Sequence, residues 1–102
     1  MNMEQMMKQA QQFQQRLAQL QEELAMKKVS SSVGGGMVTA TVNGRHEVLE
    51  LRIDREIINP DEQVMLQDLV VAAINDAMKK AQEMAQQEMT SLTGGIRIPG
   101  LF

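Results

Sequence analysis

Residues 37–54, with the sequence MVTATVNGRHEVLELRID, carry the clearest structural pattern in this chain. Apolar and polar side chains alternate in both halves of the stretch, which is typical of antiparallel strands with one covered face. The predicted apolar face contains Val38, Ala40, Val42, Leu49, Leu51 and Ile53. Asn43 and Gly44 suit a two-residue type I′ turn, because both tolerate positive φ. We therefore predict strands at about 37–43 and 46–54, joined as a hairpin.

Two helical patterns flank the hairpin, and both are longer than a small sheet can cover. The first, at about 2–26, repeats apolar side chains at alternating steps of three and four residues. Its seam consists of Met3, Met6, Ala10, Phe13, Leu17, Leu20 and Leu24. The second, at about 60–92, has Asn59 as N-cap and Pro60 at its first position. It would be about 48 Å long, whereas a strand of about six residues spans about 20 Å.

The parts of both helices that extend beyond the sheet need another surface on which to bury their apolar side chains. This predicts an obligate partner, most simply a second copy of this chain. The first helix reaches the sheet by its C-terminus and the second leaves it by its N-terminus, so residues 1–12 and 84–98 should lie far from the sheet. Residues 64–74 are apolar almost all round, and we expect them under the sheet and at a subunit interface. The narrower stripe of residues 77–89 suits a single partner helix.

Two segments are less defined by their pattern. Residues 29–33, VSSSV, fit either an edge strand or a linker, and Gly34-Gly35-Gly36 fits a turn. The tail at 93–102 is apolar but is interrupted by Pro and Gly, so it either docks or stays mobile. We expect a single domain over residues 1–102.

Composition restricts the functions that this chain can perform. It has 102 residues, a net charge of −3, ten Met, two Phe, and no Cys, Trp or Tyr. Disulfides and thiolate chemistry are therefore excluded, and base stacking has almost no aromatic platform. We expect a cytoplasmic chain without secretory signal or membrane contact, because it has no signal-like N-terminus and no apolar run near the roughly 20 residues of a membrane span.

No residue pattern predicts catalysis. His46 is the single histidine and has no Cys, second His or Ser-His-Asp arrangement to act with. Gly34-Gly35-Gly36 lacks the Lys-Ser/Thr of a phosphate loop, and no spacing suits metal ligands. We predict a protein that is not an enzyme and has no cofactor, metal or small-molecule substrate.

The basic side chains allow two interpretations. They are Lys8, Arg16, Lys27, Lys28, Arg45, Arg52, Arg55, Lys79, Lys80 and Arg97. They are either ordinary solvated charges or the binding surface for a polyanion. In a dimer, the number of basic side chains available to that polyanion would double. The Met-rich stripe likewise fits core packing or an adaptable protein-binding surface.

Three blocks of the sequence resemble the YbaB/EbfC family of bacterial nucleoid-associated proteins. They are residues 35–44 (GGMVTATVNG), 75–81 (NDAMKKA) and 92–102 (LTGGIRIPGLF), in matching order over essentially the whole chain. The resemblance implies an α+β fold with a long N-terminal helix, a three-stranded antiparallel sheet and a long C-terminal helical segment. It also implies a tweezer-like homodimer, and it makes residues 27–32 the first strand.

The resemblance further implies that double-stranded DNA contacts both helical segments. On this sequence the basic positions on those segments are Lys8, Arg16, Lys27, Lys28, Lys79 and Lys80, and Arg97, a weaker candidate, lies just beyond the last helix. Two features depart from the family: Thr39 stands where a basic residue is common, and Glu83 and Glu88 place negative charge on the distal part of the second helix. The leading hypothesis is a nucleoid-associated protein that organises DNA and modulates gene expression. The rivals are a protein-binding adaptor or holdase-like clamp and a structural assembly factor.

Overall fold

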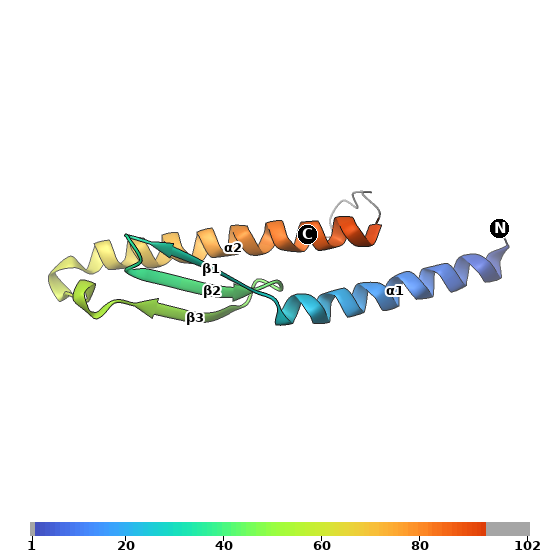
Figure 1. Ribbon diagram of the computed structural model, residues 1–102, viewed down its shortest axis with the longest axis horizontal. Coiled ribbons are helices and arrows are strands. Elements are labelled where there is room, and N and C mark those ends of the chain that lie inside the picture. The colour runs from blue at the N-terminus through green and yellow to red at the C-terminus, as the bar shows by residue number, and fades with distance from the viewer. Residues whose placement is uncertain (1, 94–102) are drawn as a thin grey trace.

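The computed structural model describes residues 2–93 of the chain and has the predicted α+β architecture. In chain order its elements are α1 (Met3–Met26), β1 (Lys28–Val33), β2 (Val38–Asn43), β3 (Val48–Ile53), the 3₁₀ turns η1 (Arg55–Ile57) and η2 (Pro60–Glu62), and α2 (Gln63–Thr93). The molecule is elongated, with extents of 69 × 20 × 17 Å, and both long helices lie along its length (Figure 1). The predicted tail from residue 94 onward lies outside the described residues.

The three strands form one antiparallel sheet in the order β1-β2-β3. Residues 29–33 are therefore strand rather than linker, and the register pairs Val29 with Val42 and Ala40 with Leu51. On the face of the sheet away from α2, hydroxyl pairs connect β1 to β2: Ser30 to Thr41 at 2.8 Å and Ser32 to Thr39 at 2.7 Å. This outer face is polar, so the apolar core is confined to the opposite face.

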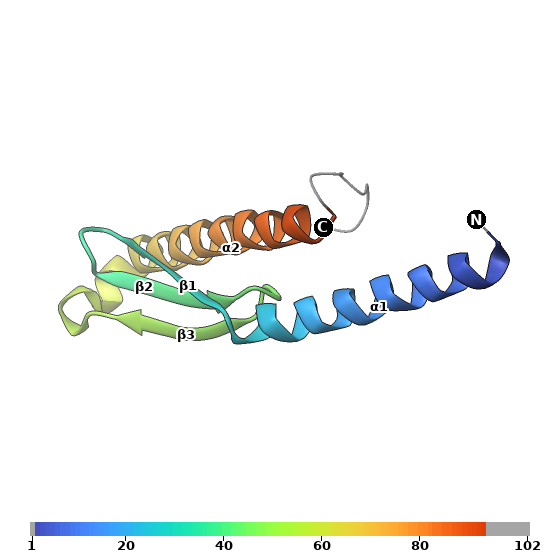
Figure 2. The same cartoon turned by 45° about the vertical axis from the view of Figure 1, so that its right-hand side comes forward.

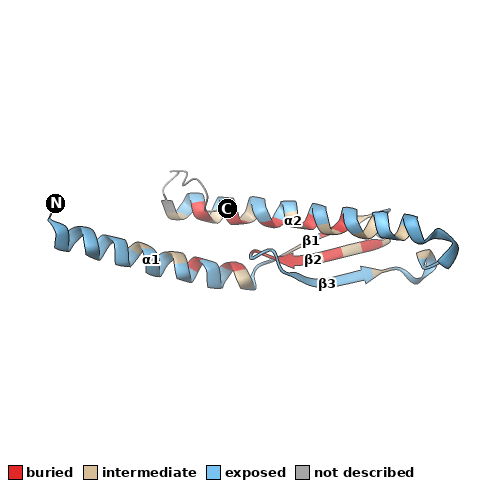
Figure 3. Ribbon diagram, turned by 180° about the vertical axis from the view of Figure 1, so that it is seen from behind, coloured by how far each residue is buried: buried red, intermediate tan, exposed pale blue. Residues whose placement is uncertain are grey.

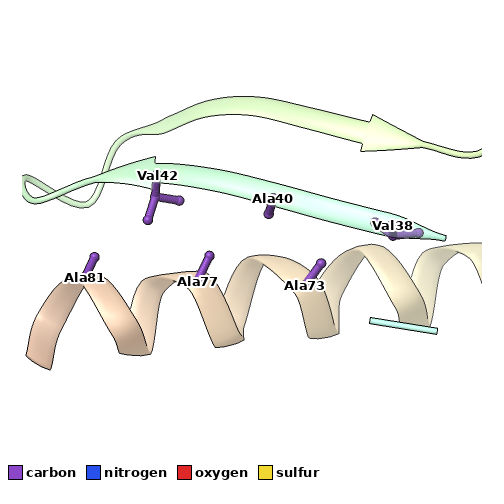
Figure 4. Packing of buried hydrophobic residues seen from close by; sticks show 6 residues of the cluster. All are labelled: Val38, Ala40, Val42, Ala73, Ala77 and Ala81. Carbon is purple, nitrogen blue, oxygen red and sulfur yellow. The ribbon is translucent and has the colours of Figure 1, made fainter. Parts of the chain in front are cut away.

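Helix α2 packs across β1 and β2 through a row of small side chains. Ala73, Ala77 and Ala81 are fully buried and face Val38, Ala40 and Val42 of β2 (Figure 4). Because Ala adds no bulk beyond Cβ, the helix backbone lies close to the strand. The prediction that residues 77–89 meet only a helix is therefore wrong for Ala77 and Ala81, which contact the sheet.

A second, smaller core joins the two helices beyond the sheet. Leu20 and Leu24 of α1 pack with Ala85 and Met89 of α2. The N-terminal part of α1 makes no such contact: residues 2–12 are exposed, and the helix continues past the end of α2 (Figures 2 and 3). The free end of α1 is thus far from the sheet, as the chain direction predicts.

The predicted two-residue turn at Asn43-Gly44 is wrong. The backbone N–H of His46 donates to the Asn43 carbonyl at 3.1 Å, and that of Asn43 donates to the Glu47 carbonyl at 3.0 Å, so residues 44–46 form a three-residue loop. His46 is in the left-handed region at φ 65°, and Gly44 is not among the residues with positive φ. Such loops combine a type I turn with one left-handed residue.

Strand β3 is only partly covered, which also departs from the sequence-based expectation. A bulge shifts the pairing between Thr41 and Val42, so Val48 rather than Leu49 lies opposite Val42. Val48 and Leu51 consequently share the sheet face that α2 covers on β2. They remain 45% and 39% exposed, because α2 lies over β1 and β2 and not over β3.

The start of the last helix confirms Asn59 as an N-cap but begins with a 3₁₀ turn. The Asn59 side-chain oxygen accepts from the Asp61 N–H at 3.0 Å, and Pro60 opens η2. The α-helix itself begins at Gln63 and not at residue 60.

Candidate nucleic-acid interface

Two of the predicted DNA-binding residues lie on α1. Lys8 and Arg16 are exposed, and within the described part of the chain neither forms an ion pair. Lys8 belongs to residues 2–12, which are exposed, and α1 continues past the end of α2 (Figure 1). These cations are therefore available to a polyanion.

Lys27 and Lys28 lie where α1 meets the sheet, and the structure separates their roles. The ammonium of Lys27 forms an ion pair with Glu88 of α2, across 61 positions in the sequence. Lys28 is the first residue of β1 and is exposed, without an ion pair among residues 2–93. Because its charge is already opposed by Glu88, Lys27 is a weaker attractor of phosphate than Lys28 in this arrangement.

Lys79 and Lys80 are adjacent on α2 but face different surroundings. The Lys80 ammonium donates to the Ser30 carbonyl of β1 at 3.2 Å and lies 4.0 Å from the Asp76 carboxylate. Asp76 in turn accepts a hydrogen bond from the hydroxyl of Ser31, which is buried. Lys79 is exposed and is not in an ion pair within residues 2–93, so it is the freer of the two cations.

The basic positions form a series along the long axis of the molecule. Along α2, Lys80 and Glu88 are about 12 Å apart. The ion pair between Glu88 and Lys27 places these two residues at the same point along the long axis. Another 16 Å of α1, roughly, separates Lys27 from Arg16, and a further 12 Å or so leads to Lys8. The structure thus distributes these side chains over about 40 Å instead of gathering them in one patch. Arg97 lies outside the described residues.

Asn43 holds α1 against the hairpin, a role that the sequence pattern did not predict. The Asn43 side-chain amide donates to the Ala25 carbonyl at 3.2 Å and to Glu47 Oε1 at 2.9 Å. Its side-chain oxygen accepts from the N–H groups of Arg45 and Glu47, each at 3.0 Å. Asn43 is only 3% exposed. An Asn-Gly pair is typical of a turn, so the sequence pattern did not indicate that the Asn43 side chain also connects the hairpin to α1.

Other kinds of site find little support in residues 2–93. They contain no cluster of three or more His, Cys, Asp or Glu side chains that could hold a metal ion. The part of the chain that the structure describes also has no helix with the length and apolarity to cross a membrane. Met84 and Met89 pack between the helices, whereas Met3, Met6 and Met7 are exposed.

The fold and its exposed cations define a small α+β protein with polyanion-binding potential along two projecting helices. The chain belongs to the YbaB/EbfC DNA-binding family, whose model matches residues 1–96. This confirms the resemblance drawn from the three sequence blocks.

Named relatives and a solved structure agree with this assignment. A nucleoid-associated protein of Syntrophobacter fumaroxidans is 54% identical over 95 residues, covering 93% of this chain and 86% of the relative. One from Pelotomaculum thermopropionicum is 50% identical over 101 residues, covering 99% and 96%. The crystal structure of the uncharacterized protein HP0035 from Helicobacter pylori superposes with a TM-score of 0.84 at 26% identity, covering 92% of this chain and 99% of that one.

Proposed function

We propose that this chain is a homodimeric nucleoid-associated protein that binds double-stranded DNA in the cytoplasm. In this role it organises the nucleoid and modulates gene expression. The observation that carries the proposal is membership of the YbaB/EbfC DNA-binding family over residues 1–96. The names of relatives from Syntrophobacter and Pelotomaculum support the nucleoid association.

The distribution of charge supports a phosphate-binding role. Lys8, Arg16, Lys28 and Lys79 are exposed and outside the ion pairs formed within residues 2–93. A net charge of −3 argues against binding over the whole surface, so local contacts by these side chains have to supply the attraction. In a dimer, the projecting helices of the two protomers would contact a duplex at points about one turn of DNA, or roughly 34 Å, apart.

The uncovered part of the sheet supports a second copy as the partner. Asp76 and Lys80 mark the flank of α2 that faces β1, so Ile74 and Met78 lie on the flank toward β3. Both are partly buried apolar residues that border the core. Together with Leu51 of β3 they leave an apolar strip beside the core, which the same strip of a second chain would bury by two-fold symmetry.

A titration of duplex DNA across a salt series tests the DNA-binding proposal. The logarithm of the binding constant should fall linearly with the logarithm of salt concentration, by about 0.9 per phosphate contacted. If all four exposed cations of each protomer bind phosphate, the slope approaches about −7. Absence of binding at low salt, or binding that salt does not weaken, would overturn the proposal.

A pair of charge reversals tests where the DNA lies. Lys79→Glu should weaken binding and make the salt slope shallower, because it removes one cation from each protomer. Arg55→Glu changes the net charge equally but lies in η1, at the far end of the sheet from α1, and should have a much smaller effect. Equal losses from both variants would contradict a role for the helical cations.

A further inference from the structure

The exposed segment of α1 carries a stripe of glutamines that the phosphate contacts leave unexplained. We propose that Gln5, Gln9 and Gln12 read adenine edges in the DNA major groove, with Lys8 and Arg16 holding the flanking phosphates. This inference rests on the proposed duplex binding and gives it a base preference.

Helical geometry places these glutamines on one face. At about 100° per residue, Gln5, Gln9 and Gln12 fall within an arc of about 60°. Arg16 falls inside the same arc, and Lys8 lies about 40° beyond its edge. The apolar seam is centred roughly 100° away, so the stripe stays free when the seam packs against another helix. Gln12 and Arg16 also line the same shallow hollow on α1, together with Gln15, Ala18, Gln19 and Glu22.

The charge of this segment distinguishes it from an ordinary solvated helix face. Residues 5–21 contain no Asp or Glu, and their only charged side chains are Lys8 and Arg16. Within the two long helices, this segment is the longest stretch without a carboxylate that would repel phosphate. Its polar surface consists mainly of amides, which suit hydrogen bonding to bases better than they suit long-range attraction.

The shape of the segment permits entry into the major groove. Residues 2–12 are exposed and lie beyond the end of α2, so no other part of the described chain blocks their approach (Figure 2). A helix with side chains is about 10–12 Å wide, which fits a major groove about 12 Å wide. A glutamine amide there donates an N–H to adenine N7 and accepts from adenine N6–H, a bidentate contact that other base pairs do not offer.

The test uses an alternating d(AT) duplex and the same duplex with 7-deazaadenine in place of every adenine. The modified base keeps the phosphates and the base pairing but lacks the N7 acceptor. The wild-type chain should bind the modified duplex at least about fivefold more weakly for each adenine read. The salt slope should be the same for both duplexes, because glutamine contacts release no counterions.

Matched variants locate the effect on the stripe. Gln9→Ala with Gln12→Ala should weaken binding to the d(AT) duplex and abolish the difference between the two duplexes. Gln14→Ala with Gln21→Ala removes two amides from the opposite face of α1 and should leave the difference intact. All four changes favour helix, so loss of folding is not the expected cause of any effect.

Two outcomes overturn the inference in distinguishable ways. If the wild-type chain binds both duplexes equally with a normal salt slope, DNA binding stands but base reading by α1 is refuted. If it binds neither duplex at low salt, the proposed function falls and the inference falls with it.

Discussion

The backbone N–H of Gly44 donates a hydrogen bond to the carbonyl oxygen of Leu24 at 2.8 Å, which ties the hairpin loop to the last turn of α1. The same N–H lies 3.1 Å from the Lys27 carbonyl. A Cβ at position 44 would lie 2.7 Å from the Leu24 oxygen and 2.8 Å from its Cβ, so only glycine fits. This contact fixes where α1 leaves the sheet, and therefore where its exposed cations point.

Gly44→Ala should lower the free energy of unfolding by about 1–3 kcal/mol, because the loop must move away from Leu24 and weaken the hydrogen bond. Urea denaturation measures the change. Gly35→Ala is the control, because nothing lies within 4 Å of its Cβ although its φ is +69°. That backbone strain alone should lower the free energy of unfolding by only about 1 kcal/mol. A smaller loss for Gly44→Ala than for Gly35→Ala would contradict the close-approach argument.

Ala77→Leu should destabilise the protein by about 1–3 kcal/mol, because the larger side chain must fit between α2 and β2. Ala77 is fully buried, and its Cβ points toward β2 (Figure 4). Ala72→Leu adds the same atoms on an exposed position of the same helix and should change the stability little. Thermal or urea unfolding of the two variants provides the comparison, and equal stabilities would refute tight packing at this row.

Leu51→Glu should shift the chain from dimer to monomer, because it places a charge in the apolar strip beside the core. Light scattering or sedimentation at micromolar concentration measures the mass. Arg52→Glu introduces the same residue on the next position of β3, where the side chain points to the polar outer face and pairs with Glu50. It should leave the dimer intact. A wild-type chain that is a stable folded monomer would refute the dimer itself.

Glu88→Gln should tighten DNA binding and steepen its salt dependence by about 0.9 per protomer, because it frees Lys27 for a phosphate. Its effect on stability should be small, about 0–1 kcal/mol, since the Lys27 and Glu88 side chains are 43% and 31% exposed and water screens the pair. Glu83→Gln is the matched control, as it removes the same charge from an exposed position of α2 that is not in an ion pair within residues 2–93. If both variants increase DNA affinity equally, the cause is the general change in net charge and not the release of Lys27.

The candidate interface could be predicted as a set of residues but not as an arrangement. Six basic residues within the described chain were predicted from the sequence, because they are the cations on or beside the two helical segments that the family resemblance implicates, and their contact with DNA stays a prediction. Glu88 as the partner of Lys27 and Ser30 as a partner of Lys80 could not be found, because they are 61 and 50 positions away. Only the packing of α1 and β1 against α2 decides which cations remain free.

Local sequence patterns were enough to predict both long helices, the two hairpin strands and their order, whereas residues 29–33 stayed open between strand and linker. The period-two alternation of residues 37–54 defines strands, the three-and-four spacing of the α1 seam defines a helix, and Asn59 with Pro60 marks where the last helical region begins. These are local signals, because backbone geometry alone sets the two periods and the capping bond. Three further features come from tertiary contacts: the bulge that turns Val48 inward, the close approach that requires glycine at position 44, and the placement of α2 over β1 and β2. Each depends on side-chain volume and hydrogen bonding between segments far apart in the chain, for which local periodicity carries no signal.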